Sequence, residues 1–441
     1  MQYVMLALFS WFVLRAIFKP FEGLIGLLAV NMINPGEIWP LLNILHLERL
    51  LVLLTGIGIF IRPVPFVYPP LTKRVFWFWG AMFLSVPLSF WPGGAARFAL
   101  DFGRIILYYF LITNLADTQK RILVLIVVFA LLIGWVCGGS LWSYMNGIFD
   151  QMAIRNGFER ATGLSESNGN PNTVGLTLVS GLPICFLLFY MRSKWLKLMA
   201  LGLTVSCIIG VLLTGSRTSF SNLCIICFCA LLNRKGIKFI PLLMVAAMVT
   251  WIVIPQQYKD RYSKIVSVAT GKEKDESYDA HAMAREAGYH MMMDYPITGV
   301  GCGQFPIADG QKYWPSKGEK LWENPHNLYI QVAAELGIIG VATWLAFMVP
   351  FVSMTRRLKL LFKTPEYEGL HPALKNFPRA CMFSLAALFI GGMFGHTLYR
   401  HTWYMLAGMT VALERVVATS HFAKEEAAPV GEQEEAFSYP A

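Results

Sequence analysis

Long apolar segments separated by short polar stretches dominate the sequence. Each of these segments has the length, or nearly the length, of a helix that crosses a bilayer, which needs about 20 residues. The segments cover residues 2–18, 21–34, 48–61, 75–91, 98–115, 122–143, 173–191, 198–214, 218–232, 238–254, 327–353, 378–396 and 402–418. The short segment 21–34 could be re-entrant or tilted. The pattern therefore predicts an all-α fold, a polytopic transmembrane bundle of about 12–13 helices.

The composition favours the same class. Of the 441 residues, 56% are hydrophobic and 15% are charged, and the mean hydropathy is +0.51. Soluble domains average about 25% charged residues. The N-terminus has neither a basic leader nor an A-x-A cleavage site, which indicates a first membrane span. The lipid bilayer is therefore the first expected partner.

The basic residues lie in short clusters between the apolar segments. A net charge of +10 in this arrangement does not indicate nucleic acid, which would need the charges on one face. If every segment crosses once, the clusters share one side, which the positive-inside rule makes cytoplasmic. The opposite side then holds residues 35–47, 92–97, 144–172, 215–217, 255–326 and 397–401.

Four regions follow from this division: an N-terminal bundle (1–254), an external loop domain (255–326), C-terminal transmembrane helices (327–418) and a tail (419–441) expected to be cytoplasmic and disordered. The loop domain contains Trp314, Trp322 and a predicted helix over 279–294. Long loops without a packing role tend to carry binding or active sites.

Arg217 is the first candidate for chemistry. In T-G-S-R-T-S it stands between two apolar segments, at the external membrane edge, surrounded by hydroxyls and a glycine. An arginine can simply extend to the interface from a helix end. The surrounding polar groups favour anion binding.

The predicted helix in the loop domain holds the second candidate. Helical spacing places His281, Arg285 and Tyr289 along one face. The glycine-rich stretch that follows is no P-loop, because it lacks the G-K-[ST] ending. Taken alone, Arg285 is equally compatible with an ordinary helix surface.

His326 precedes an apolar segment in E-N-P-H-N-L-Y, again at the external edge. A neutral imidazole can accept the proton of an attacking hydroxyl. A Pro-His-Asn sequence before a helix also suits N-terminal capping. Together, two guanidinium groups and an imidazole could stabilise a departing diphosphate and activate a hydroxyl.

The combined motifs resemble the bacterial O-antigen ligase and O-antigen polymerase superfamily. They are S-R-T-S after an apolar segment, R-E-A-G-Y-x(5)-Y-P-I-T-G-V-G-x-G-Q-F, and P-H-N-L-Y-x(5)-E-L-G-I-I-G. R-A-T-G-L-S-E-S-N-G-N-P-N resembles a further element and adds Arg160, Asn170 and Asn172. The opening F-K-P-F-E-G-L-I-G-L-L-A-V-N-M-I-N-P resembles the exosortase-associated O-glycosylation ligase subgroup.

The resemblance implies a glycosyltransferase of the membrane-embedded C-type fold in the bacterial inner membrane, with its active site facing the periplasm. The donor would be an undecaprenyl-diphosphate-linked glycan, and the acceptor a hydroxyl of lipid A core, a glycan or a protein. No metal or other cofactor would be needed. Arg217 and Arg285 would bind the diphosphate and His326 would act on the acceptor. Tyr289 stands near a position where the family commonly has tryptophan.

Residues expected to bind substrate are Arg160, Asn172, Tyr289, Asn327 and Arg400. Arg400 joins this set because it lies with His396 in the short external loop before the last segment. Glu335, nine residues after His326, is expected to be a packing partner rather than a base.

Two other groups of polar residues inside apolar segments have structural interpretations. Asp101 and Arg104 are i, i+3 neighbours that could satisfy one another. Cys224 and Cys227 form a C-x-x-C without a second pair, which indicates buried packing rather than a metal site.

Two alternatives stay open. A polymerase that joins glycan repeats shares the motifs of a ligase. A transporter or flippase of a lipid-linked glycan would show paired repeats and correspondingly broken helices, and no internal repeat is found in the sequence.

Overall fold

The computed structural model describes residues 2–151, 154, 158–165, 169–231, 252, 254–263, 276–313, 322 and 324–426. Most of the predicted segment 238–254, as well as Trp314 and the tail beyond residue 426, lies outside these residues. The division into four regions stays a prediction.

Helices are the regular structure of the described residues, apart from a single bridge between Phe149 and Ala161. The all-α prediction is therefore confirmed. The helices of the N-terminal half are α1 (Gln2–Phe18), α2 (Pro20–Ile33), α3 (Pro35–Ile38), α4 (Pro40–Ile44), α5 (Leu47–Ile61), α6 (Pro70–Ser85), α7 (Pro92–Leu115), α8 (Gln119–Met145), α10 (Pro171–Phe186), η2 (Leu187–Tyr190), α11 (Lys194–Leu213) and α12 (Arg217–Leu231). The remainder are α14 (Gln256–Ser263), α16 (Glu276–Asp294), α17 (Phe305–Ala308), η4 (Asp309–Tyr313), α18 (Leu328–Leu361), η5 (Pro365–Tyr367), α19 (Pro372–Gly392) and α20 (His401–Glu426).

Six helices of the described chain are long and apolar enough to cross a membrane. They are α7, α8, α10 with η2, α11, α18 and α19. Helices α1, α2 and α12 are apolar but shorter. This set confirms a polytopic membrane protein, because several long apolar helices pack side by side in one bundle.

Proline explains why the observed limits of α6 and α7 differ from those of the predicted segments. Helix α6 begins at Pro70 and ends at Ser85, whereas the predicted segment was 75–91, and α7 begins at Pro92 rather than at residue 98. Proline is favourable at the first position of a helix, where its missing N–H is not needed. Val86 still has helical backbone angles, but Pro87 has no backbone N–H to continue the helical hydrogen bonds, so α6 stops there.

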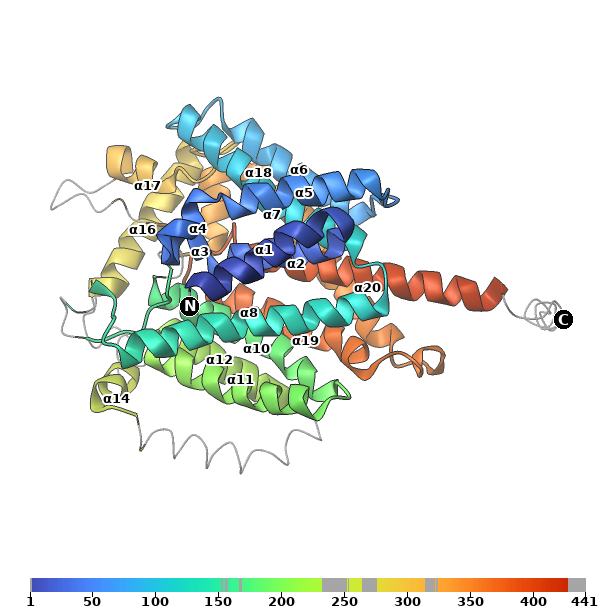
Figure 1. Cartoon of the computed structure of the whole chain (residues 1–441). Helices are drawn as coiled ribbons and strands as arrows, with labels where there is room; N and C mark the ends of the chain where they lie inside the picture. The colour runs from blue at the N-terminus through green and yellow to red at the C-terminus, as the bar shows by residue number, and fades with distance from the viewer. Residues whose placement is uncertain are drawn as a thin grey trace, which may run out of the picture.

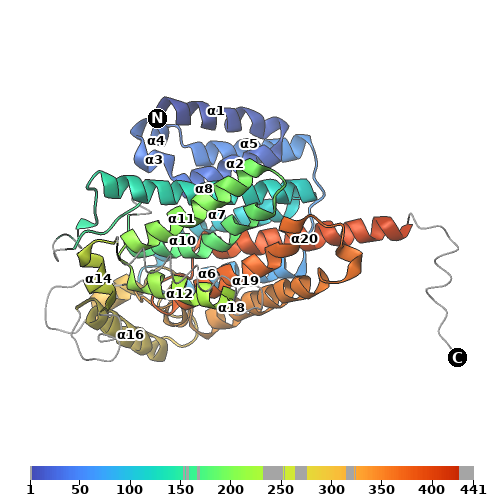
Figure 2. The ribbon, with the colours of Figure 1, turned by 90° about the horizontal axis from the view of Figure 1, so that it is seen from below.

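The short connecting helices gather at one end of the bundle. Figure 1 shows α3, α4, α14, α16 and α17 at the left end, whereas the last turns of α20 project from the right end. Figure 2 shows α14 and α16 at the same end after the rotation. The segments predicted to share one side, 35–47, 144–172 and 255–326, therefore meet at one end. Which compartment faces that end stays a prediction.

A break in α18 shapes this end. Gly337 lies inside the helix with φ 60° and ψ −158°, so the backbone leaves the helical course for one residue. The turn 295–303 pairs with the break through hydrogen bonds from Val300 N to Ala334 O (2.8 Å) and from Ile338 N to Pro296 O (2.8 Å). The turn therefore occupies backbone groups that an uninterrupted helix would satisfy itself.

Two glycines permit this close approach. A Cβ atom on Gly337 would lie 2.3 Å from the carbonyl oxygen of Ile297, and one on Gly299 would lie 2.3 Å from the carbonyl carbon of Glu335. Both glycines have positive φ angles, which glycine adopts without steric cost.

The predicted pairing of Asp101 with Arg104 is wrong. Arg104 donates to the Glu48 carboxylate at 2.8 Å, and its only hydrogen bond to Asp101 is to the backbone oxygen. The hydroxyl of Tyr108 donates to the same Glu48 carboxylate. Because α5 and α7 are separated by α6 in the sequence, adjacent spacing along one helix could not reveal this partner.

The buried packing predicted for the C-x-x-C cysteines is also wrong in part. Cys224 is exposed and Cys227 is half-buried on α12, and both are free thiols. The surface of a membrane helix meets lipid, so an apolar side chain there does not need to be buried in protein.

We expect Gly337→Ala to destabilise the protein, by about 1–3 kcal/mol, because alanine would be strained at this backbone conformation and would contact Ile297. Thermal unfolding in detergent measures the change. Gly138→Ala, in α8 with open space around it, is the control and should leave the melting temperature unchanged. Equal melting temperatures for both variants would contradict the role assigned to the break.

Candidate functional site

The predicted site residues occupy two clusters, and helices α14 and α16, which contribute to them, lie at the same end of the bundle (Figure 1). One cluster contains arginines around the beginnings of α10 and α12, and the other contains histidines around α16 and the beginning of α18. The segment 393–400, between α19 and α20, contacts both.

Arg160 is the buried member of the arginine cluster. Its Nε donates to Thr214 O at 2.8 Å and its Nη2 donates to Asn172 Oδ1 at 2.7 Å. Burial, together with the nearby positive charges of Arg261 and Arg217, lowers the pKa of Arg160 to about 10. Arg160 and Asn172, both predicted to bind substrate, are therefore direct partners, and the charges near Arg160 include the carboxylate of Asp150 as well as the two arginines.

Arg217 is the first residue of α12 and is half-buried. The turn before it contains Gly215, whose φ angle is +58° and where a Cβ atom would lie 2.6 Å from the Phe158 ring. Arg261 covers this turn: its Nε donates to Gly215 O at 2.8 Å, and its guanidinium lies 4.7 Å from the centre of the Phe158 ring. Arg261 therefore belongs to the same cluster.

Helix α14 places Arg261 through two buried tyrosines. The Tyr258 hydroxyl donates to Leu213 O at 3.1 Å, and the Tyr262 hydroxyl donates to Leu212 O at 2.8 Å. Burial raises the pKa of both hydroxyls, which therefore stay protonated as donors. Part of the predicted external loop is in this way fixed onto the end of α11.

Arg400 reaches the cluster from the other side. Its Nη2 donates to Thr177 Oγ1 and lies 3.4 Å from Thr173 O, both on the first two turns of α10. Burial lowers the pKa of Arg400 to about 10. Its Nε is buried without a hydrogen-bond partner among the described residues. The residue as a whole is half-buried, and no carboxylate is bonded to it in the described structure.

The N-terminal ends of α10 and α12 lie against each other in this cluster. A Cβ atom on Gly175 would lie 2.5 Å from Ser219 Oγ and 3.2 Å from Thr214 Oγ1. Helix N-termini carry partial positive charge and free N–H groups. Two such ends add to the positive field of the arginines, so this region suits an anion.

The second cluster is built on His326. This residue has a left-handed backbone (φ 45°) immediately before α18, and its ring stacks on that of His281 with the centres 4.0 Å apart and the planes 9° apart. The His396 ring meets it edge-on at 5.4 Å. Within the described residues, no group of three or more His, Cys, Asp or Glu side chains is arranged to hold a metal ion.

Arg285 follows His281 by one helical turn in α16 and is half-buried. Tyr289 lies another turn along and is 59% exposed. The helix predicted over 279–294 is confirmed, and it begins three residues earlier, at Glu276. His281 and Arg285 thus lie on the same side of α16, with His281 against His326.

Asn327 caps α18. Its Oδ1 accepts from Tyr329 N at 2.9 Å and from Ile330 N at 3.1 Å, and its Nδ2 donates to Met393 O at 3.0 Å. These contacts give Asn327 a structural role in holding His326 and the segment 393–400. Its predicted contact with substrate stays a prediction.

Glu335 connects the segment 393–400 with the glycine turn. Its buried carboxylate accepts from the Tyr399 hydroxyl at 2.6 Å and from Gly303 N at 2.8 Å. Burial and this carboxylate raise the pKa of Tyr399, which stays protonated as the donor. Leu398 N donates to Gln331 Oε1 at 3.2 Å beside it. The role of Glu335 is more specific than the packing partner we expected.

Comparison with protein families tests the resemblance predicted from the sequence. Residues 202–345 match the O-antigen ligase family model. The resemblance to the O-antigen ligase superfamily is therefore confirmed, and it indicates a membrane ligase or polymerase of the glycosyltransferase type. The exosortase-associated subgroup stays a prediction. A comparison with curated proteins finds no match.

The O-antigen ligase match includes the segments that carry Arg217, Arg285, Tyr289, His326 and Asn327. It includes α12, α16, the glycine turn and the break in α18. Arg160, Asn172 and Arg400 lie outside it, so they join the O-antigen ligase-like region through the three-dimensional contacts described above.

Arg261 is the site residue that sequence reasoning missed. It lies in Q-Q-Y-K-D-R-Y-S, where nothing distinguishes it from other basic residues of a polar loop. The alternation of two tyrosines with this arginine on a short helix was the available signal, because it places Tyr258 and Tyr262 one turn apart.

We expect Glu335→Ala to destabilise this O-antigen ligase-like protein strongly. The Gly303 N–H and the Tyr399 O–H would lose their acceptor, at a cost of about 1–3 kcal/mol for each unsatisfied buried donor. Thermal unfolding and limited proteolysis near residue 396 measure the effect. Glu368→Ala removes an exposed carboxylate at the loop after α18 and should change neither. A stable, protease-resistant Glu335→Ala protein would contradict the role.

Proposed function

We propose that this protein transfers a glycan from undecaprenyl diphosphate to an acceptor hydroxyl, as an O-antigen ligase-like glycosyltransferase of the membrane-embedded C type. The observation that carries the proposal is the arginine cluster. Arg160 is a buried cation and Arg400 a half-buried one, both bind the N-terminal part of α10, and Arg400 has no carboxylate bonded to it in the described residues.

A buried cation is costly unless an anion compensates it. Four guanidinium groups, those of Arg160, Arg217, Arg261 and Arg400, gather around two helix N-termini. A diphosphate has the charge and the several acceptor oxygens that suit such a cluster. The donor diphosphate therefore gives these residues a common ligand.

The proposed reaction uses residues from both clusters. The acceptor oxygen forms a bond to the anomeric carbon of the donor sugar, and the bond from that carbon to the diphosphate oxygen breaks. His326 receives the proton of the acceptor hydroxyl. The electron pair of the broken bond stays on the diphosphate, where Arg217 and Arg285 stabilise its negative charge.

The arrangement favours a reaction at the membrane surface. The sugar and the acceptor need access from the aqueous side, whereas the lipid part of the donor stays in the bilayer. Arg261 of α14 belongs to one cluster and His281 of α16 to the other, and Figure 2 shows both helices at the same end of the bundle. With the basic loops cytoplasmic, this end faces the periplasm.

We expect Arg217→Ala, Arg285→Ala and His326→Ala each to lower transfer about 100-fold or more, because each removes a group that acts in the transition state. Purified protein is incubated with a polyprenyl-diphosphate-linked glycan and with lipid A core, a glycan or a protein as acceptor, and the product is measured. Arg192→Ala, an exposed arginine in the loop between η2 and α11, is the matched control.

The identity of the acceptor distinguishes a ligase from a polymerase. Extension of the donor glycan itself would indicate a polymerase, and transfer to lipid A core or protein would indicate a ligase. Full transfer by an Arg217→Ala/His326→Ala double variant would contradict the mechanism.

Arg400→Met tests the half-buried cation directly. We expect transfer to fall at least about tenfold, because a charged hydrogen bond to the donor is lost, whereas the melting temperature should stay equal or rise. Arg415→Met is the control: Arg415 donates to Thr113 O, so its loss should lower stability and spare transfer. A destabilised Arg400→Met protein with unchanged transfer per folded molecule would make Arg400 a structural residue.

A further inference from the structure

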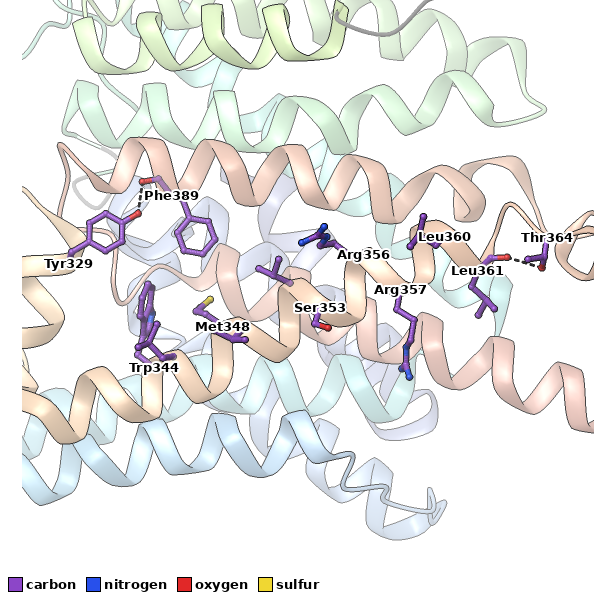
Figure 3. A pocket seen from close by; sticks show the side chains of 13 residues that line it. Tyr329, Trp344, Met348, Ser353, Arg356, Arg357, Leu360, Leu361, Thr364 and Phe389 are labelled. Carbon is purple, nitrogen blue, oxygen red and sulfur yellow. Dashed lines mark hydrogen bonds between the residues drawn. The ribbon is translucent and has the colours of Figure 1, made fainter.

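A groove on the surface of α18 begins at Tyr329, beside the histidine cluster, and extends along the helix away from both clusters. It has a volume of about 940 Å³ and runs along α18 beside α19, from Tyr329 to Thr364. Figure 3 shows its lining side chains distributed along most of the length of α18, with Phe389 contributed by α19. The proposed transfer mechanism does not use this groove.

The two halves of the groove differ in chemistry. The half nearer the clusters is lined by Trp344, Met348 and Phe389, whereas the other half contains Ser353, Arg356 and Arg357. An apolar groove with two guanidinium groups in its far half, followed by Leu360, Leu361 and Thr364, suits a molecule with a hydrocarbon chain and a negatively charged head.

The two arginines are not equivalent. Arg357 forms an ion pair with Glu414 of α20, which holds it against the protein. Arg356 is exposed, and Figure 3 shows it pointing to the opposite side of α18, toward α19 and the groove. Arg356 is therefore the residue placed to contact a ligand head group, because the charge of Arg357 is already paired with that of Glu414.

The length of the apolar half of the groove matches that of one acyl chain. From Trp344 to Arg356, twelve residues of helix rise about 18 Å. The hydrocarbon region of one leaflet is about 15 Å thick, half of the roughly 30 Å of the whole bilayer. A chain anchored at Arg356 thus reaches about the bilayer centre, as an acyl chain of one leaflet does.

We propose that this groove binds an anionic phospholipid of the leaflet opposite the reaction site, with its phosphate on Arg356 and one acyl chain along Val352, Met348 and Trp344. By the charge of its loops, this leaflet is the cytoplasmic one. The site fixes a lipid between α18 and α19, the two helices that carry the site segments at their other ends.

The test uses the full chain purified in detergent with added phosphatidylglycerol or phosphatidylcholine. Native mass spectrometry measures retained lipid, and thermal unfolding measures the stabilisation that binding produces. We expect phosphatidylglycerol to be retained in preference to phosphatidylcholine. Arg356→Gln should reduce its retention about fivefold, and Lys359→Gln, an exposed basic residue one turn away that does not line the groove, should not.

A second pair of variants tests the apolar half. Val349→Trp fills the groove and should also reduce retention, whereas Leu201→Trp, on the exposed surface of α11, should not. Melting temperatures in phosphatidylcholine should stay the same for all four variants. Equal retention of both lipids, equal losses in Arg356→Gln and Lys359→Gln, or displacement of phosphatidylglycerol from the groove by a polyprenyl diphosphate would overturn the proposal.

Discussion

The backbone pairing between the glycine turn and the break in α18 is the constraint on which the rest of this end depends. The turn 295–303 takes hydrogen-bonding groups of α18 that a continuous helix would use itself, and Gly299 and Gly337 allow the two backbones to touch. Glu335 stands next to the break and holds Gly303 and Tyr399. The end of α16, the beginning of α18 and the segment before α20 are thereby fixed relative to one another, which gives His326 and Arg400 defined positions.

The arginine cluster differs from this backbone pairing in what it contributes to the protein. Burial disfavours the charged forms of Arg160 and Arg400, and the hydrogen bonds that these two side chains donate in the described structure go to neutral oxygens of the backbone, Asn172 and Thr177. Neutral acceptors orient a guanidinium without neutralising it. Such a cluster is poorly suited to hold the fold together and well suited to hold a multiply charged anion that arrives from outside, which is why the proposed donor fits it.

Periodicity and length predicted most of the membrane helices, because an apolar run of this kind has few other structures available in lipid. The limits of α6 and α7 were missed where proline, rather than hydropathy, begins or ends a helix. Arg160 and Asn172 could be grouped in advance because they lie in one motif, and Arg285 and His281 because they lie on one helix face. The partner of Arg104 and the place of Arg261 could not, because both depend on contacts between segments more than 40 residues apart.

The segment 393–400 is short, yet it touches both clusters: His396 meets His326, and Arg400 meets α10. Only three residues lie between His396 and Arg400, so adding or deleting one residue would shift the imidazole environment and the guanidinium together. Under the proposed function, a change in the length of this segment would thus alter the surroundings of the acceptor base and of the donor-binding arginines at once, whereas a substitution at His396 or at Arg400 would alter one of them.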